Sequence, residues 1–434
     1  SLDDHAGDSL TINGDVTFAN IQSAGSLFLV DVSSTASDSI TINGDLNAVD
    51  IVNQAGDTEA SGLRVAMNVT DQGKGANTTD AILTVNGEQN VDSVILAGLG
   101  GDFADTILEA EMQQDGNGNW VIAYTAGLSD LGAAASSVSH LAESFWMRTA
   151  SAFFDSERSS NIGESSRVKG LHAWSTMFHT DSDMESRGDV KGQDLAYSQL
   201  LSNHMAGATY NTKLGDSWLS ISPMVGKGYA DGNQLAQQSS AALDTETLAV
   251  NATFSLNSFY ASAMMQQVDF DARVRGNGAA GSTSGKAHGF SLEGGWTYLL
   301  ESGIAMTSFA QWDDVKVELD AFTASNANYD YAYDLGNSKR ARAGVSLRKS
   351  FKLADGFASP YATFSATNIN NANNHDLYSN GVRFGSDVAG AGYGIDFGVD
   401  GKYKLWTIKS GLGVHTGDTD KNGLSGHFAI SRSL

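Results

Sequence analysis

Gly7-Asp8-Ser9-Leu10 contains a serine that could act as a nucleophile in ester hydrolysis. Such a serine needs a histidine within hydrogen-bond reach and a carboxylate that orients the histidine. The first 165 residues contain only His5 and His140, and neither has an aspartate three positions before it. Ser9 also returns as Ser39 in a repeat. We therefore expect Ser9 to be a structural residue and expect no catalytic residues.

Metal and cofactor chemistry has little support in the sequence. The segment 100–105, Gly-Gly-Asp-Phe-Ala-Asp, has the composition of a calcium-binding glycine–aspartate repeat, but such repeats act in tandem and this one is single. The chain has no cysteine, which excludes disulfides, thiolate metal sites and cysteine nucleophiles. We expect no metal and no cofactor. The remaining histidines are scattered without the spacing of metal ligands: His172, His179, His204, His288, His375, His415 and His427.

Charge divides the chain into two parts. Lys and Arg number 26 against 50 Asp and Glu, which gives a net charge of −24. Residues 1–128 hold only Arg64 and Lys74 as basic residues, against 19 acidic ones. Nucleic acid is excluded as the main partner, because phosphate binding needs clustered Lys and Arg. Most aromatic residues lie after residue 128, so the two parts occupy different environments.

The acidic part contains a repeat. Asp8-Ser9-Leu10-Thr11-Ile12-Asn13-Gly14-Asp15 returns 30 residues later, and residues 81–87 form a looser third copy. Each copy alternates apolar and polar residues and ends in Asn-Gly, which indicates a short strand followed by a turn. Strand-only repeats of this length favour a right-handed β-solenoid, and a β-sandwich remains an alternative.

A helix is predicted after the repeats. Ser129-Asp130 can cap it, and residues 131–157 contain no proline and one glycine. Apolar and small residues fall at helical spacing on one stripe: Val138, Leu141, Ala142, Phe145, Thr149 and Ala152. Twenty-seven helical residues span about 40 Å, enough to cross a bilayer. An ordinary core helix is the alternative.

From residue 168 to the end, apolar and polar residues alternate with a period of two, as expected of β-strands. One face of each segment is apolar, and the other carries glycine or charge, which is typical of an outer-membrane barrel with a wet lumen. We expect these side chains to face the lumen: Arg340, Arg342, Arg348, Asp396, Asp400, Lys402 and Lys409. Short and long connections alternate, and 376–388 is interpreted as a loop. The predicted strands number twelve: 168–180, 198–213, 216–229, 243–257, 258–275, 285–300, 303–319, 338–351, 357–371, 389–404, 405–417 and 421–434.

This order of elements resembles the C-terminal part of the classical (type V) autotransporters. Gly118-Asn119-Trp120-Val121-Ile122 is similar to the Trp-bearing strand that ends the autochaperone region of that family, and residues 25–30 resemble its start. The resemblance implies an all-β fold with three parts. Residues 1–128 would end a β-solenoid passenger, 129–165 would form a linker with a pore-spanning α-helix, and 166–434 would form a 12-stranded antiparallel transmembrane β-barrel.

The resemblance also implies a function. The barrel would anchor in the bacterial outer membrane and export the chain's own passenger, leaving residues 1–128 on the cell surface. Its partners would be outer-membrane lipid, the barrel-assembly and periplasmic chaperone machinery and the passenger itself, with the chain a monomer. We expect Glu143 and Arg148 to join Val138, Leu141 and Phe145 as pore-helix residues, and to pair with lumen charges on the strands around residues 396–409.

Two features depart from the family pattern. The last strand carries Phe428 and Ile430 at alternate positions of the barrel C-terminal signal, but Arg432 interrupts it and Leu434 replaces the usual aromatic. Some members cleave themselves at an asparagine of the helix, whereas Asn161 here follows the helix. Two other functions remain as alternatives, a hydrolase anchored by the barrel and a porin-like ligand-binding barrel.

Overall fold

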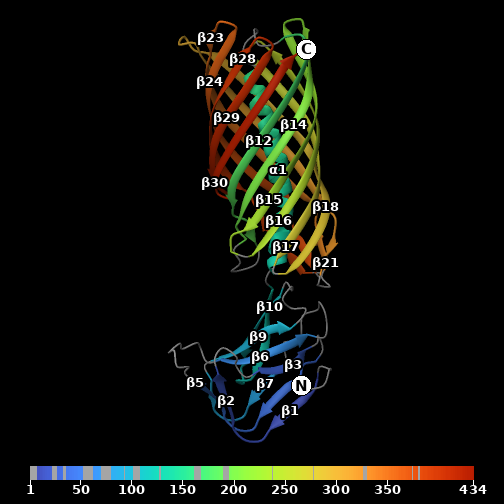
Figure 1. The fold of residues 1–434 in the computed structure, drawn as a ribbon, viewed down its shortest axis with the longest axis vertical. Helices are drawn as coiled ribbons and strands as arrows, with labels where there is room; N and C mark the ends of the chain where they lie inside the picture. The colour runs from blue at the N-terminus through green and yellow to red at the C-terminus, as the bar shows by residue number, and fades with distance from the viewer. Residues whose placement is uncertain are drawn as a thin grey trace. The chain divides into compact units, whose positions relative to one another are not determined.

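The computed structural model divides the chain into two compact units at Ser129 and Asp130, with residues 324–329 grouped with the first unit. The structure describes residues 7–21, 27–32, 36–51, 62–69, 80–91, 93–100, 108–126, 129–160, 168–188, 195–236, 238–276, 278–325, 330–373, 375–379 and 382–434. Figure 1 shows both units, and each is described by itself below.

Three parallel sheets build the first unit, and each successive repeat adds one strand to each sheet. The first sheet contains β1 (Ser9–Ile12), β4 (Ser39–Ile42) and β7 (Leu83–Val85). The second contains β2 (Val16–Ile21), β5 (Leu46–Ile51) and β8 (Gln89–Asn90). The third contains β3 (Leu27–Val32), β6 (Gly62–Val69) and β9 (Ser93–Gly100).

The register follows the sequence repeat. Ser9 lies opposite Ser39 and Ile40 lies opposite Leu83, so all three predicted copies pair in line. The Asn-Gly turns stack: Asn43 Nδ2 donates to Asn13 Oδ1, and Asn86 Nδ2 donates to Asn43 Oδ1, both at 2.7 Å. Glycine is required beside this ladder, since a Cβ on Gly44 would lie 2.4 Å from the carbonyl carbon of Gly14.

An antiparallel hairpin ends the first unit. It consists of β10 (Leu108–Gln114) and β11 (Trp120–Ala126), and β11 continues the first sheet beyond β7. The side chain of Asp115 closes the hairpin turn by accepting hydrogen bonds from Asn117 and Asn119, and these bonds lower its pKa, the side chain of Asn119 most. The core between the sheets is aliphatic: Val30, Ile40, Ile42, Leu46, Ile82, Leu83, Val94 and Ile122.

Twelve antiparallel strands close into a barrel in the second unit, because the last strand pairs with the first. The predicted strand count is therefore confirmed. The strands are β12 (Gly170–Met184), β14 (Tyr197–Leu214), β15 (Ser217–Gln234), β16 (Ser239–Leu256), β17 (Phe259–Gly276), β18 (Ala279–Leu299), β19 (Ile304–Leu319), β22 (Gly336–Lys349), β24 (Gly356–Asn373), β28 (Gly390–Tyr403), β29 (Trp406–Gly417) and β30 (Asp420–Ser433).

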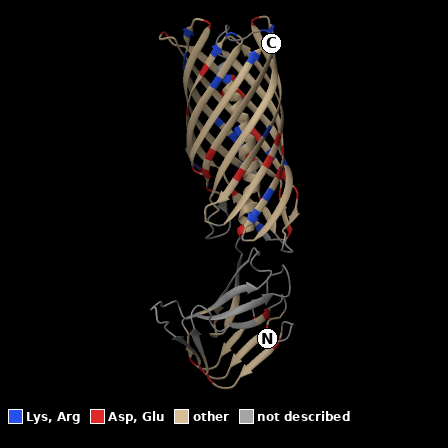
Figure 2. Cartoon of the chain, in the orientation of Figure 1, with Lys and Arg blue, Asp and Glu red and all other residues tan. Residues whose placement is uncertain are grey.

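The outer face of the barrel is apolar near the short turns. Leu248, Met265 and Leu412 are each more than 60% exposed, and Trp296, Tyr298 and Tyr403 lie near the strand ends. Toward the long connections, ion pairs join neighbouring strands on the outer faces of β15 to β19. Figure 2 marks charged residues at this end of the barrel. These strands therefore extend beyond the apolar belt.

The long connections contain short strands of their own. Residues 376–388, interpreted above as a loop, include β25 (Leu377–Ser379), β26 (Val382–Phe384) and β27 (Ser386–Asp387). None of these joins the barrel sheet. Instead, β25 and β26 extend a small sheet with β20 (Phe322–Thr323) and β21 (Asp330–Tyr333), and β27 pairs with β13 (Arg187–Gly188). A further short strand, β23 (Phe351–Leu353), pairs with β24 near the other end.

Inside the barrel lies α1 (Asp130–Ser160), a helix of 31 residues. The sequence predicted 131–157, so the helix is slightly longer than expected. Among the described residues no helix is both long and apolar enough to cross a bilayer.

Candidate functional site

The candidate site is the lumen of the barrel and the helix that occupies it. Most described residues of α1 are buried, including the polar Ser136, Ser137 and Thr149, and a half-buried stripe of Ser144, Arg148, Ala152 and Asp155 borders a cavity. A largely buried helix that is not apolar needs polar partners, because each buried polar group must be hydrogen-bonded. The lumen side chains of the strands supply these partners.

The first half of the helix is held at the end where the long connections lie. Gln234 Nε2 donates to the carbonyl of Ala133 at 3.0 Å, and the Tyr333 hydroxyl donates to the carbonyl of Ala135 at 3.2 Å. The loop beside it is fixed by Tyr378, whose hydroxyl donates to Asp334; this hydrogen bond raises the pKa of Tyr378. The connection between β19 and β22 thus holds the start of α1 directly, and the connection between β24 and β28 is bound to it.

Small lumen residues make room for the helix, as the glycine-rich lumen face predicted. A Cβ on Gly228 would lie 2.8 Å from Phe145, and one on Gly232 would lie 2.9 Å from Leu141. The contact is closest at Gly276, where a Cβ would lie 2.4 Å from the backbone nitrogen of Leu131.

In the middle of the lumen the helix is joined to the wall by reciprocal hydrogen bonds. Trp146 Nε1 donates to the carbonyl of Gln266 at 3.2 Å, and Gln266 Nε2 donates back to the carbonyl of Trp146 at 3.3 Å. Asn203 Nδ2 donates to the Thr149 hydroxyl at 3.1 Å. These contacts lie on β14 and β17, on the same side of the lumen as Gly228 and Gly232 of β15.

Charged contacts hold the second half of the helix. Arg340 bridges strand and helix: it donates to Asp313 at 2.6 Å, to the carbonyl of Met147 at 3.0 Å and to the Ser151 hydroxyl at 2.7 Å. Arg342 donates to Asp155 at 3.0 Å. Charged donors make these bonds stronger than neutral ones.

Arg158 forms the most buried ion pair of this half. It lies 2.6 Å from Glu293 and also contacts Asp155, and its guanidinium lies over the ring of Phe309. Nothing in the sequence pattern singles out Arg158, because its partner Glu293 lies on the distant strand β18.

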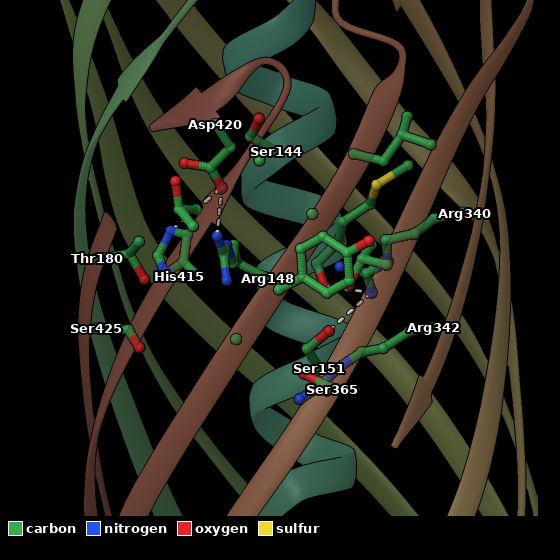
Figure 3. Close-up of a pocket in the computed structure, with 18 of the residues that line it drawn as sticks. Ser144, Arg148, Ser151, Thr180, Arg340, Arg342, Ser365, His415, Asp420 and Ser425 are labelled. Carbon is green, nitrogen blue, oxygen red and sulfur yellow. Dashed lines mark hydrogen bonds and ion pairs between the residues drawn. The ribbon is translucent and has the colours of Figure 1, made fainter. Parts of the chain in front are cut away.

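The opposite wall of the lumen does not contact the helix as closely. A cavity of about 140 Å³ separates α1 from β24, β28, β29 and β30, and a second of about 130 Å³ lies along the second half of the helix. Figure 3 shows the first cavity, where Arg148 reaches Asp420 at 2.7 Å and His415 lies 3.2 Å from the same carboxylate. The helix is therefore off-centre in the barrel.

The predicted lumen residues all face the interior, with partners that sequence did not reveal. Arg348 pairs with Asp400, Lys409 donates to the carbonyl of Ser156, and Asp396 lies 3.9 Å from Arg342. Lys402 lines the second cavity.

The predicted pairing of the helix charges with this group was wrong. Glu143 instead contacts Ser338 and His375, and Arg148 contacts Asp420. Val138, Leu141 and Phe145 are fully buried in the lumen.

The last strand places its signal residues on the outer face. Phe428 is 38% exposed and Leu434 is 73% exposed, while Ile430 alternates with the buried Ala429. Arg432, which interrupts the pattern, lies with its guanidinium 5.2 Å from the ring centre of Trp406. Asn161, considered for self-cleavage, lies outside the described residues.

Residues 173–414 match the family model described as the autotransporter beta-domain. The chain belongs to the autotransporter family. Its barrel is an outer-membrane translocator for passenger export. No curated protein matches the chain.

Two solved structures have the same fold. The beta domain of the Bordetella autotransporter BrkA is 17% identical, with a TM-score of 0.50, and the match covers 61% of this chain and all of that one. The translocator domain of the autotransporter NalP from Neisseria meningitidis is 13% identical, with a TM-score of 0.50, and the match covers 68% of this chain and 99% of that one. Autotransporter translocator domains are not themselves enzymes.

Proposed function

We propose that α1 is the pore segment that keeps this translocator closed after export, and that residues 1–128 are the C-terminal end of the exported β-helical passenger on the cell surface. The observation that carries the first part is the burial of α1 within a closed barrel. A twelve-stranded barrel is too wide to be filled by its own side chains, since about eight strands suffice for that.

The orientation of the helix supports surface exposure of the passenger. Its first half contacts the long connections, and its second half lies toward the short turns. Outer-membrane barrels have short turns on the periplasmic side and longer loops outside. The chain that precedes Asp130 would therefore continue on the outer side.

The three parallel sheets support a β-solenoid. Each repeat adds a strand to every sheet and buries apolar residues against the preceding one. Stacking of this kind releases free energy step by step, which would favour outward movement of the passenger without ATP. The barrel-assembly and chaperone partners, and the monomeric state, are further proposals implied by family membership.

The closing role of α1 is tested by deleting residues 131–157 from the full chain. We expect single-channel conductance in planar bilayers to rise and the melting temperature in detergent to fall. A shift in gel mobility between boiled and unboiled samples would show that the deleted variant still forms a barrel. Unchanged conductance in a folded variant would contradict the proposal.

Surface exposure is tested separately, by an epitope inserted at Gly116 in the hairpin turn, where a side chain meets no other atom within 4 Å. Antibody binding to intact cells is expected, and an epitope placed in the turn at Asp216 is the control that should stay hidden. Binding only after lysis would contradict the proposal for residues 1–128.

For the two alternatives, a barrel-anchored hydrolase and a porin-like barrel, the described residues provide no specific support.

A further inference from the structure

Two histidines and a glutamate meet inside the barrel near the long connections. His140 and Glu143 are one turn apart on α1, and His375 precedes β25 in the long connection between β24 and β28. Their exposed fractions are 0%, 1% and 2%. One ligand atom from each of the three residues lies within 4.8 Å of the others.

Each of these side chains is oriented by a serine. The Ser386 hydroxyl lies 2.8 Å from His140 Nε2, Ser338 donates to Glu143 Oε2 at 2.7 Å, and the Ser139 hydroxyl contacts His375 Nδ1. Metal-binding histidines characteristically have their second ring nitrogen held by such a partner, which fixes the ring and leaves the first nitrogen for the metal.

A direct contact joins only two of the three residues. His375 Nε2 lies 2.7 Å from Glu143 Oε2, which satisfies both groups. His140 Nδ1 is buried and has no hydrogen-bond partner among the described residues. A buried nitrogen without a hydrogen-bond partner is costly, and the contact between His375 and Glu143 does not explain the burial of His140.

We propose that His140, Glu143 and His375 bind a divalent transition-metal ion, with Zn²⁺ as the natural occupant. Two imidazoles and one carboxylate are a donor set that zinc accepts, and a serine hydroxyl or a water would complete a tetrahedron. At zinc–ligand distances of about 2.0–2.2 Å, neighbouring ligand atoms of a tetrahedron are about 3.3 Å apart. His375 and Glu143 would therefore separate by roughly half an ångström from their present contact.

The site would tie the long connection to the helix. His375 belongs to the connection, whereas the other two ligands belong to α1, so the three donors meet only when the helix is in the lumen and the connection is folded over it. An ion that binds only this arrangement stabilises it. Zinc would thereby hold the outer end of the closed translocator.

The test uses the full chain, purified in detergent and stripped with a chelator. One equivalent of ZnCl₂ is added, free metal is removed by desalting, and zinc is measured by mass spectrometry. We expect about one zinc per chain, a higher melting temperature, and with Co²⁺ the visible absorption bands of a tetrahedral site. Wild-type protein that retains no zinc would overturn the proposal by itself, without recourse to variants.

Variants identify the ligands. His375→Ala and Glu143→Gln should lose stoichiometric zinc, and Ser386→Ala should weaken zinc affinity by roughly tenfold or more, as loss of an orienting partner does. His204→Ala, which changes an exposed histidine on β14, should bind zinc like the wild type. Gel mobility of unboiled samples shows whether each variant is folded. Equal zinc retention by folded His375→Ala and wild type would place the ion elsewhere and overturn the assignment.

Discussion

Arg158 on α1 and Glu293 on β18 form an ion pair across the lumen, with Nη2 2.6 Å from Oε2 and with side chains 5% and 1% exposed. Glu293 also accepts a hydrogen bond from the Tyr260 hydroxyl at 2.7 Å. The pair therefore couples the second half of the helix to the barrel wall at a place that water hardly reaches.

Arg158→Met should lower the free energy of unfolding by about 3–5 kcal/mol, because it leaves the Glu293 carboxylate buried without its counter-charge. Guanidinium unfolding in detergent, followed by tryptophan fluorescence, measures the change. The double variant with Glu293→Leu should recover much of the loss, since removing both charges of a buried pair is often nearly neutral. A double variant as unstable as the single one would contradict this account.

Arg148→Ala should have a much smaller effect, of about 0–1 kcal/mol, in the same measurement. Arg148 also pairs across the lumen, with Asp420, but both side chains are 26% exposed and border the first cavity. We expect water to screen charges at this exposure and to replace the lost partner. An effect as large as that of Arg158→Met would mean that the cavity is dry.

Gly276→Ala should displace the start of the helix. The added Cβ would lie 2.4 Å from the backbone nitrogen of Leu131, which cannot move aside as a flexible side chain could. We expect a loss of about 1–3 kcal/mol, typical of overpacking, together with more frequent channel opening in planar bilayers. Gly294→Ala is the matched control, because its nearest contact would be an ordinary 3.7 Å. Equal behaviour of the two variants would show that α1 is not tightly seated at this point.

Ser9→Ala should leave hydrolysis of short-chain esters at the background rate. Ser9 lies in β1 opposite Ser39 of β4, at an equivalent position of the repeat, as expected of a structural residue. A hydrolysis rate that depends on Ser9 in a spectrophotometric ester assay would revive the hydrolase alternative.

The barrel strands were predictable because each is bounded by two different environments. Lipid selects apolar side chains on one face and the lumen selects small or charged ones on the other, so a period of two appears in the sequence itself. The segment from Tyr393 to Asp400 illustrates this: Tyr393 and Phe397 are 67% and 56% exposed on the outer face, and Asp400 is buried in the lumen. The stacked Asn-Gly turns were predictable from the sequence for a similar reason, since each repeat must place the same residues in line with those of the preceding repeat.

The sequence by itself determined the barrel strands, the helix, their order and the direction of the strand side chains, because these depend on local periodicity. The short strands of the long connections, such as β25 to β27, have no such pattern. Only the tertiary structure decided which lumen groups meet. Glu143 is bound to Ser338 and His375, and Arg158 is bound to Glu293, partners that depend on how the strands close and on how the helix is rotated within the lumen. The off-centre position of α1, with cavities on the side of β28 to β30, has the same origin: it results from packing against one wall, and no local pattern encodes it.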